Sequence, residues 1–315
     1  MSSRKRALIA GGAGFIGSHL CEYLLNLGYE VHVADNLVTG RKENIAPLFD
    51  RGLIWFDMDV ISLHPLNHDY DEIYNLASPA SPVEFSRIPV FILKTAAIGH
   101  MQLLEMAKDN GCPILLASTS EVYGDPLVHP QREDYLGNVN PVGPRGCYDE
   151  AKRYAEALSM AYHRMYKVDT RIVRIFNTYG PRMRPEDGRI IPNFAMQAFR
   201  REPLTVFGDG RQTRSFCYVS DMVAGLYALM QSSEHMPVNI GNPVERSVLE
   251  MADEINRLTG NTKAHKFLPL PQDDPKQRCP DISRARQILK WEPKVSLAQG
   301  LEKTLAYFRE QASST

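Results

Sequence analysis

The 315 residues of the chain, 43% hydrophobic and 23% charged, suffice for one large domain or two smaller ones with a sizeable core. The formal net charge of −1 gives no long-range attraction to nucleic acid or to an anionic membrane. We therefore expect neither partner, and any anionic ligand must be held by locally placed Arg and Lys.

The cysteines and histidines predict neither a disulfide framework nor a metal site. Five cysteines without a CxxC pair favour reduced thiols in the cytoplasm. The closest histidines in sequence, His64 and His68, lie in a loop-like stretch. A strand begins within six residues of Met1, which leaves no room for the apolar core of a signal peptide, and no apolar run approaches ~20 residues. We expect a cytoplasmic location.

Short apolar runs alternate with amphipathic stretches in the first half of the chain, as is typical of β-α-β units and a parallel sheet. Strands are predicted at Arg6–Ala10, Glu30–Ala34, Leu53–Phe56, Ile73–Leu76, Ile114–Ala117 and Arg171–Phe176. Helices are predicted at Phe15–Leu27, Phe91–Lys108, Tyr148–Tyr166, Val219–Met230, Val248–Leu258, Ile282–Leu289 and Leu297–Phe308. Residues 177–215 are rich in Pro, Gly and Arg and predict a loop-dominated lobe. The fold class is α/β, a Rossmann-type doubly wound parallel sheet with a smaller C-terminal lobe.

Three glycines, Gly11, Gly14 and Gly17, lie in GGAGFIG between the first strand and the first helix. Glycine is needed where the turn is tight and where a pyrophosphate approaches backbone N–H groups at a helix N-terminus. The second strand leads into Asp35, 18 residues beyond Gly17. A carboxylate there accepts hydrogen bonds from ribose hydroxyls and repels a 2′-phosphate. The pattern favours NAD, although Arg41 and Lys42 could accept the 2′-phosphate of NADP.

Tyr148 is the only tyrosine of the chain followed four residues later by a lysine, Lys152. On a helix this spacing places both side chains on one face, where the ammonium favours the phenolate. A solvated helix pair is the alternative. The strand at 114–117 continues into Thr119, and ligands bind at the carboxyl edge of a parallel sheet. Thr119 is therefore a candidate catalytic residue, or else it caps the next turn.

Together, the glycine loop, Thr119 and the Tyr148–Lys152 pair resemble the extended short-chain dehydrogenase/reductase superfamily along nearly the whole chain. Further segments narrow the resemblance to the UDP-glucuronate decarboxylases (UDP-xylose synthases). They are DNLVTGRKEN (35–44), NLASPASP (75–82), LLASTSEVYGDP (115–126), GCYDEAKR (146–153), RIFNTYGPRM (174–183), PLTVFGDGRQTRSF (203–216) and DDPKQRCPDI (273–282). The chain departs from the family at Phe85, where a tyrosine is usual, and at Ala96 and His100, where the family reads KTNxxGT.

The resemblance implies NAD as cofactor and a UDP-sugar as substrate. Its cofactor residues would be Gly11, Gly14, Phe15, Ile16, Gly17, Asp35, Asn36, Leu37, Thr39, Gly40, Asp59, Val60, Leu76, Ser78, Thr95, Tyr148 and Lys152. The UDP-sugar would be held by Lys94, Glu121, Asn177, Arg189, Phe207, Arg214 and Arg278. The catalytic residues would be Thr119, Glu121, Tyr148, Lys152 and Arg278.

The implied reaction is decarboxylation of UDP-glucuronate to UDP-xylose through a 4-keto intermediate, with tightly held NAD reduced and reoxidised in each turnover. Two carboxylates in one dry site disfavour double ionisation, so we expect a raised pKa for Glu121 beside the substrate carboxylate. Alternatives are a decarboxylase that releases NADH and a UDP-4-keto-pentose, a nucleotide-sugar 4,6-dehydratase, and an inactive dinucleotide-binding sensor. Ser120 stands where dTDP-glucose dehydratases have Asp.

The domain and assembly predictions follow from the same resemblance. Residues 1–176, with 216–240 returning to them, are expected to form the NAD-binding Rossmann domain. Residues 177–215 and 241–315 are expected to form the UDP-sugar-binding lobe. The helical stretches 91–108 and 148–166 pair into a four-helix interface in this superfamily, so a homodimer is expected. Alternatively, their apolar faces are covered within one chain.

Overall fold

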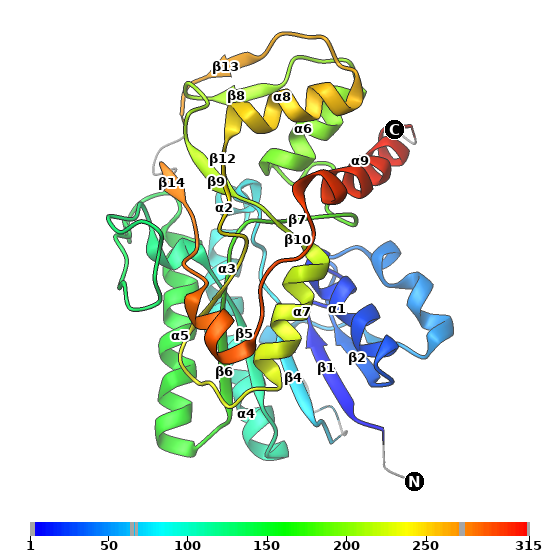
Figure 1. The fold of residues 1–315 in the computed structure, drawn as a ribbon. Helices are drawn as coiled ribbons and strands as arrows, with labels where there is room; N and C mark the ends of the chain where they lie inside the picture. Colours follow the sequence, from blue (N-terminus) through cyan, green and yellow to red (C-terminus); the bar gives the residue numbers. More distant parts are fainter. Residues whose placement is uncertain (1–3, 64–65, 67–68, 271–274, 314–315) are drawn as a thin grey trace.

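The computed structural model describes residues 4–63, 66, 69–270 and 275–313. His64 and His68, and the two aspartates that open the DDPKQRCPDI segment, lie outside these residues. The chain builds a large α/β part and a smaller lobe, which lies over the carboxyl ends of the main strands (Figure 1).

The main sheet contains seven parallel strands among the described residues, in the order β11-β6-β5-β4-β1-β2-β3. They are β1 (Arg6–Ala10), β2 (Glu30–Ala34), β3 (Ile54–Phe56), β4 (Glu72–Asn75), β5 (Ile114–Thr119), β6 (Thr170–Ile175) and β11 (Val238–Ile240). Strands β3-β2-β1-β4-β5-β6 have the order of a dinucleotide-binding doubly wound fold. The predicted fold class is confirmed. Strand β11 brings the chain back to the sheet beside β6, while the proposed division into two domains stays a prediction.

Helices cover both faces of this sheet because successive strand residues point to opposite sides. On β1, Ile9 belongs to the core that packs on α1 (Phe15–Asn26) and α7 (Val219–Met230). Leu8 belongs to the core on the other face, with α4 (His100–Asn110) and α5 (Gly146–Tyr166). A strand buried on both faces reads as a continuous apolar run, which is why β1 was readable from the sequence.

The lobe combines helices with very small sheets. The strands and α-helices that follow β6, apart from α7 and β11, are β7 (Thr178–Tyr179), α6 (Ile190–Phe199), β8 (Thr205–Phe207), β9 (Thr213–Ser215), β10 (Cys217–Tyr218), β12 (Glu245–Ser247), α8 (Val248–Thr259), β13 (Lys266–Leu268), β14 (Gln277–Arg278) and α9 (Leu297–Ser313). The prediction that 177–215 is mostly loop was wrong at α6. Its Pro192 lies in the first turn, where backbone N–H groups have no helical partner to lose.

The single helix predicted at 91–108 is interrupted. Helix α3 (Pro89–Lys94) follows the short α2 (Pro82–Arg87), and a π-helical turn at Thr95–Gly99 joins α3 to α4. The Thr95 hydroxyl donates to the Phe91 carbonyl (2.9 Å) and so competes with the helical ladder. The helix predicted at 282–289 is likewise reduced to a π-helical turn at Ala285–Leu289 and the residues just before it.

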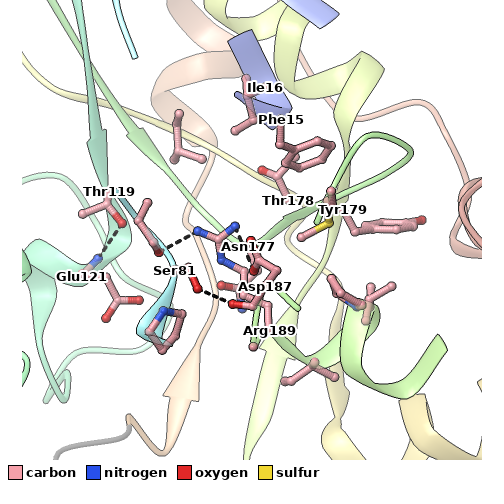
Figure 2. Close-up of a pocket in the computed structure, with 18 of the residues that line it drawn as sticks. Phe15, Ile16, Ser81, Thr119, Glu121, Asn177, Thr178, Tyr179, Asp187 and Arg189 are labelled. Carbon is pink, nitrogen blue, oxygen red and sulfur yellow. Dashed lines mark hydrogen bonds and ion pairs between the residues drawn. The ribbon is translucent and has the colours of Figure 1, made fainter. Parts of the chain in front are cut away.

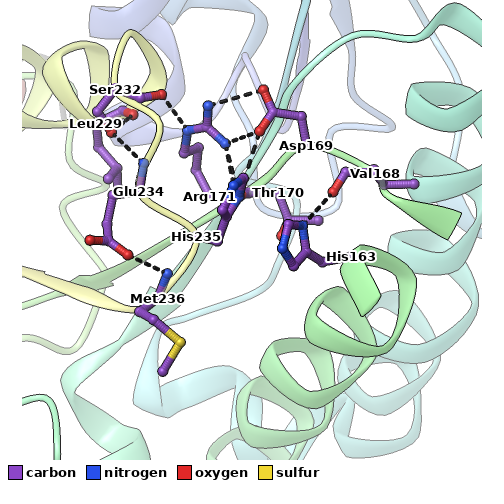
Figure 3. A network of polar contacts seen from close by, with 10 residues as sticks. All are labelled: His163, Val168, Asp169, Thr170, Arg171, Leu229, Ser232, Glu234, His235 and Met236. Atoms are coloured by element: carbon purple, nitrogen blue, oxygen red, sulfur yellow. Dashed lines mark hydrogen bonds and ion pairs between the residues drawn. The ribbon is translucent and has the colours of Figure 1, made fainter. Parts of the chain in front are cut away.

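A polar network connects the start of β6 to the loop after α7 (Figure 3). It lies at the amino ends of the strands, whereas Thr119 lies at their carboxyl ends. The buried Arg171 donates to the carbonyl oxygens of Ser232 (2.8 Å) and Thr170 (3.0 Å). It also pairs with Asp169, and the rings of His163 and His235 pack with centroids 4.0 Å apart. Arg171 therefore holds the connection that leads into β11.

We predict that Arg171→Ala lowers the free energy of unfolding by about 2 kcal/mol, because it removes the charged donor from the buried carbonyl of Thr170 and the partly buried carbonyl of Ser232. Urea denaturation followed by circular dichroism measures this loss. The matched control is Arg257→Ala, which removes an exposed pair with Glu254 and should change the free energy by less than about 0.5 kcal/mol. Equal losses in both variants would contradict the role given to Arg171.

Candidate active site

The glycine loop brings β1, the strand end of β4 and helix α1 into close contact. Gly11 has a left-handed backbone (φ 79°), and a Cβ there would lie 2.7 Å from the Leu76 carbonyl oxygen. A Cβ at Gly17 would overlap the carbonyl oxygen of Gly11. Gly14 is the N-cap residue of α1, and no side chain of the described residues caps the N-terminus of this helix. The N–H groups of the first turn are thus available to an anion such as a pyrophosphate.

The carboxylate of Asp35 is buried just after β2, beside this loop. It accepts hydrogen bonds from the backbone N–H groups of Ala13 and Leu37, both at 2.9 Å. Burial raises the pKa of Asp35, against the two backbone donors. A Cβ at Gly40 would lie 2.7 Å from a carboxylate oxygen of Asp35, so this loop needs glycine. Asp59 caps the turn that follows β3 and accepts from the Asn36 amide (3.0 Å).

Most of the predicted site residues line two adjoining cavities. The larger, about 480 Å³, is lined by Gly11, Gly14, Phe15, Ile16, Gly17, Thr39, Leu76, Ser78, Thr119, Glu121, Tyr148, Lys152, Asn177, Arg189, Phe207, Arg214 and Arg278 among others. The smaller, about 70 Å³, adds Asp35, Asn36, Gly40, Asp59, Val60 and Thr95. Ser78 lines both, and its buried hydroxyl has no hydrogen-bond partner within the described ranges. These features fit a dinucleotide that extends from the smaller cavity into the larger one.

Two predicted residues line neither of these cavities in the described part of the chain. Lys94 ends α3 with an exposed side chain, so the structure does not bring it to the substrate side. The side chain of Leu37 packs on the core, and its backbone N–H donates to the carboxylate of Asp35. The backbone of Leu37 is left-handed, with a φ of 58°.

Thr119, Tyr148 and Lys152 converge at the carboxyl end of β5. Thr119 is the last residue of β5, and its hydroxyl accepts from the Glu121 N–H (3.2 Å). The Lys152 ammonium donates to the Ala117 carbonyl (2.8 Å) and lies 5.8 Å from the centroid of the Tyr148 ring. All three catalytic candidates are buried.

Burial dominates the titration of this pair. It raises the pKa of Tyr148 to about 12, against the positive charge of Arg189 and a hydrogen bond with Thr119. It lowers the pKa of Lys152 to about 8. Without a ligand, Lys152 therefore does not lower the pKa of Tyr148 as expected. A phenolate at neutral pH needs further positive charge in the cavity.

Glu121 lies between two arginines. Arg278 donates from Nη1 to Glu121 Oε1 (2.5 Å) and from Nη2 to Oε2 (3.2 Å). Arg145 bonds to the same Oε2. Burial raises the pKa of Glu121, but the charges of Arg278 and then Arg145 outweigh it and hold the pKa well below its usual range. The predicted rise refers to Glu121 beside the substrate carboxylate and stays a prediction. In the protein alone, the two arginines, which the prediction did not include, act in the opposite direction.

Arg145 is a site residue that the sequence analysis missed. It lines the larger cavity and directly precedes α5, three residues before Tyr148. Residues three positions apart on a helix share a face, so the sequence separation from Tyr148 could have indicated Arg145 as a site residue.

The substrate side of the larger cavity carries several arginines and an exposed aromatic ring. Figure 2 shows Thr119 and Glu121 on one side and Asn177 and Arg189 facing them. Arg189 donates to the Ala80 carbonyl (2.7 Å) and pairs with Asp187 (3.4 Å). Farther into the lobe, Arg214 lies on β9, and Phe207 ends β8 with a ring that is 37% exposed.

The three departures from the family pattern lie close to this centre. The Phe85 ring stacks on Tyr148, with centroids 4.9 Å apart, and Ala96 belongs to the same apolar cluster. His100 is buried between the Asn75 amide (2.9 Å) and the Ser159 hydroxyl (2.7 Å). Burial lowers the pKa of His100 to about 3, so this histidine is neutral and brings no charge to the cavity wall.

The described residues were also searched for metal and membrane sites. No group of three or more His, Cys, Asp and Glu side chains is arranged there to hold a metal ion. Within the same ranges, no helix combines the length and apolar character needed to cross a bilayer.

The fold and the site together define a dinucleotide-dependent enzyme of the short-chain dehydrogenase/reductase type. Residues 7–241 match the NAD dependent epimerase/dehydratase family. The chain is 52% identical over 309 residues to UDP-glucuronic acid decarboxylase 1 of Xenopus tropicalis, covering 98% of this chain and 73% of that protein. It is 51% identical over 311 residues to UDP-glucuronic acid decarboxylase 1 of Arabidopsis thaliana, covering 98% and 71%.

A solved structure resembles the whole fold. UDP-glucuronic acid 4-epimerase from Bacillus cereus, in complex with UDP-glucuronic acid and NAD, superposes with a TM-score of 0.88 at 31% identity, covering 97% of this chain and 99% of that one. The chain belongs to the NAD dependent epimerase/dehydratase family and, within it, to the UDP-glucuronic acid decarboxylases.

We predict that Asp35→Ala weakens NAD binding roughly tenfold and narrows the preference for NAD over NADP, because the carboxylate that accepts from ribose and repels a 2′-phosphate is gone. Equilibrium titration with each dinucleotide measures both affinities. Asp50→Ala, at an exposed position, is the control and should leave both unchanged. An unmodified protein that binds NADP more tightly than NAD would refute this reading of Asp35.

Proposed function

We propose that this chain, with NAD bound, converts UDP-glucuronate to UDP-xylose and CO₂. The observation that carries the proposal is a Glu121–Arg278 pair in the same cavity as Tyr148, in a chain 52% identical to a UDP-glucuronic acid decarboxylase. A sugar carboxylate cannot leave as CO₂ without an electron sink. Oxidation of carbon 4 makes the sugar a β-keto acid, whose ketone takes up the electrons as an enolate. Carbon 5 then takes up a proton in place of the lost carboxyl group, and return of the hydride to carbon 4 with a proton to its oxygen gives UDP-xylose.

The NAD is assigned to the glycine loop and the two adjoining cavities. The uncapped start of α1 suits the pyrophosphate, Asp35 suits the adenosine ribose, and the unpartnered Ser78 hydroxyl suits a further polar group of the ligand. When bound, NAD supplies a hydride acceptor for carbon 4 and later returns the hydride. Its positively charged nicotinamide also favours the phenolate of Tyr148.

Tyr148 is proposed to take the proton of the 4-hydroxyl group, with Thr119 orienting that oxygen. This assignment is supported by the buried convergence of both side chains at the end of β5. Lys152, fixed by the Ala117 carbonyl, adds positive charge near the phenol and is placed to hold the nicotinamide ribose. Together these groups move one proton at the oxygen on carbon 4.

Glu121 is proposed to act in its ionised form beside the substrate carboxylate. Two negative charges repel in a dry cavity, and the repulsion ends when the carboxylate leaves as neutral CO₂. Arg278 makes this possible by holding Glu121 charged and in place, through hydrogen bonds to both of its carboxylate oxygens. Arg278 is thus a positioning residue in this proposal.

The remaining arginines are assigned to the nucleotide part of the substrate. Guanidinium groups suit a diphosphate, and Arg189 and Arg214 line the cavity wall on the lobe side. Asn177 lines the same cavity, and the exposed ring of Phe207 offers a stacking surface for uracil. Lys94 is given no contact in this arrangement.

The decisive assay uses UDP-glucuronate labelled at carbon 6, with trapped CO₂ counted and the nucleotide product identified by mass spectrometry. UDP-xylose is the expected product; UDP-4-keto-pentose together with free NADH would mean that the last reduction is not completed. Absence of labelled CO₂ would refute the proposed function.

Tyr148→Phe is expected to lower kcat roughly a hundred- to ten-thousand-fold, because it removes the general base while keeping the ring stacked on Phe85. The control is Tyr166→Phe on the same helix, where the side chain is half exposed, and its rate should equal that of the unmodified protein. Near-normal turnover by Tyr148→Phe would end the proposed mechanism.

We also propose a homodimer through α3, α4 and α5. The support is a set of apolar side chains left exposed on these adjacent helices: Val90, Leu93, Met101, Tyr154 and Met165. Apolar surface that a single chain leaves open on neighbouring helices is typical of a subunit interface.

Light scattering at micromolar concentration is expected to give twice the mass of one chain. Leu93→Asp should shift the mass toward that of a single chain, because it places a charge within the apolar contact. Leu136→Asp, an equally apolar and more exposed position in a loop, is the matched control. A single-chain mass for the unmodified protein would refute the dimer.

A cytoplasmic location is proposed from the cysteines. All five cysteines lie in the described ranges, and none of them forms a disulfide. Four of the five thiols are buried. Free thiols in this number suit a reducing compartment.

A further inference from the structure

The buried side chain of His100 joins the end of β4 to helix α5. Its Nδ1 lies 2.9 Å from the amide nitrogen of Asn75, and its Nε2 lies 2.7 Å from the hydroxyl oxygen of Ser159. All three residues are at most 4% exposed. His100 is not among the described residues that line the two cavities. It can therefore influence the reaction only through the residues that it holds.

The hydrogen bonds of this network run in one direction. The backbone N–H of Ala77 donates to Oδ1 of Asn75 (3.1 Å), so the NH₂ group of the amide is the part that faces His100. Nδ1 of His100 must therefore accept, and Nε2 carries the hydrogen that is donated to Ser159. The Ser159 hydroxyl donates in turn to the Ala155 carbonyl (2.9 Å). Because burial lowers the pKa of His100 to about 3, the ring keeps this neutral form.

The turn that Asn75 holds is part of the cavity wall. Leu76 and Ser78 line both cavities, and Ala77 lines the smaller one. The same turn packs against the glycine loop, where a Cβ at Gly11 would lie 2.7 Å from the Leu76 carbonyl oxygen and from the Ala77 nitrogen. A turn packed this closely shapes the cofactor cavity through small shifts, so its position depends on the hydrogen bonds that fix it.

The other partner of His100 connects the network to the helix that carries the proposed base. Ser159 lies on α5, where Tyr148, Lys152 and Ser159 recur at spacings that share one face. His100 itself begins α4, directly after the π-helical turn whose Ala96 packs in the same apolar cluster as Tyr148. One side chain thus links the wall of the cofactor cavity with the catalytic helix.

We propose that His100 is a positioning residue of the cofactor site, which acts through Asn75 to fix the turn at 75–78, with Ser159 on α5 as its anchor. The role rests on the assignment of NAD to these cavities and goes beyond it, because His100 lies outside them. The family pattern KTNxxGT has a threonine at this position. That side chain is shorter and carries one polar group, whereas the imidazole presents a separate nitrogen to each partner.

The test uses two substitutions that each keep one half of the network. The amide of an asparagine reaches the place of Nδ1 and that of a glutamine the place of Nε2. His100→Asn therefore keeps a partner for Asn75, and His100→Gln keeps one for Ser159. Isothermal titration with NAD should show roughly tenfold weaker binding for His100→Gln and a change of less than about threefold for His100→Asn, because only His100→Gln leaves the Asn75 amide unpaired. Equal weakening by both, weakening by neither, or the reverse order overturns the proposal.

His163→Gln is the matched control, since it makes the same exchange at another hydrogen-bonded histidine of α5, in the network at the amino ends of the strands. It should leave the affinity for NAD unchanged. In an Asn75→Ala background, His100→Gln should cause no further loss, because the connection through Asn75 is already gone. A second loss of the same size in that background would contradict the route through Asn75.

A measurement on the unmodified protein does not depend on whether the variants fold, which thermal unfolding establishes for each of them. Nitrogen-15 NMR of labelled histidine distinguishes a ring nitrogen that carries a hydrogen from one that does not. His100 should show a bare Nδ1 and a hydrogen on Nε2, without change between about pH 6 and about pH 8. A hydrogen on Nδ1 would overturn the proposal, because the ring could not then accept from Asn75.

The cofactor assignment and the role of His100 can fail separately. If the unmodified protein does not bind NAD, the assignment of the cavities falls and the role of His100 with it. If it binds NAD and His100→Asn and His100→Gln bind it equally, only the role of His100 is wrong.

Discussion

The site depends first on the close approach of Gly17 to the carbonyl of Gly11, which no side chain would allow. This contact starts helix α1 directly against the end of β1. Because the described strands of the main sheet are parallel, the ends of β2 and β5 lie on the same edge, with Asp35 and Thr119. The residues proposed for cofactor binding and for proton transfer therefore lie at the same ends of the strands.

The electrostatics of the protein alone differ from those the reaction needs. Burial keeps Tyr148 protonated and weakens the basicity of Lys152, whereas two arginines keep Glu121 ionised. In the proposed function, the positive charge of the bound nicotinamide would favour the phenolate of Tyr148. The ligand is then part of the catalytic electrostatics.

Local patterns were sufficient for much of the fold. The strands predicted at 6–10 and 30–34 and the helix at 219–230 coincide with β1, β2 and α7, since each has its own periodicity or apolar run. Helix α6 was missed because it is apolar on nearly every side and lies among loops rich in Pro, Gly and Arg. The interruption at Thr95–Gly99 depends on a side-chain hydrogen bond and on packing against Val60, which no periodicity records. In the site, the glycine loop and the Tyr148–Lys152 spacing were readable. Arg278 was expected only from the family resemblance and Arg145 was missed, because tertiary packing brings both arginines to Glu121.

The pairing of Glu121 with Arg278 has a consequence for the order in which the molecule assembles. The two residues are 157 positions apart, and Arg278 is held by the short strand β14 beside β9. Contacts of such separation form only after the intervening chain has closed into a loop, at an entropic cost that local contacts do not carry. A chain that has folded its first half alone holds Glu121 without this partner. The pKa of this carboxyl group therefore falls further when the last part of the polypeptide docks, because Arg278 is the charge that lowers it most.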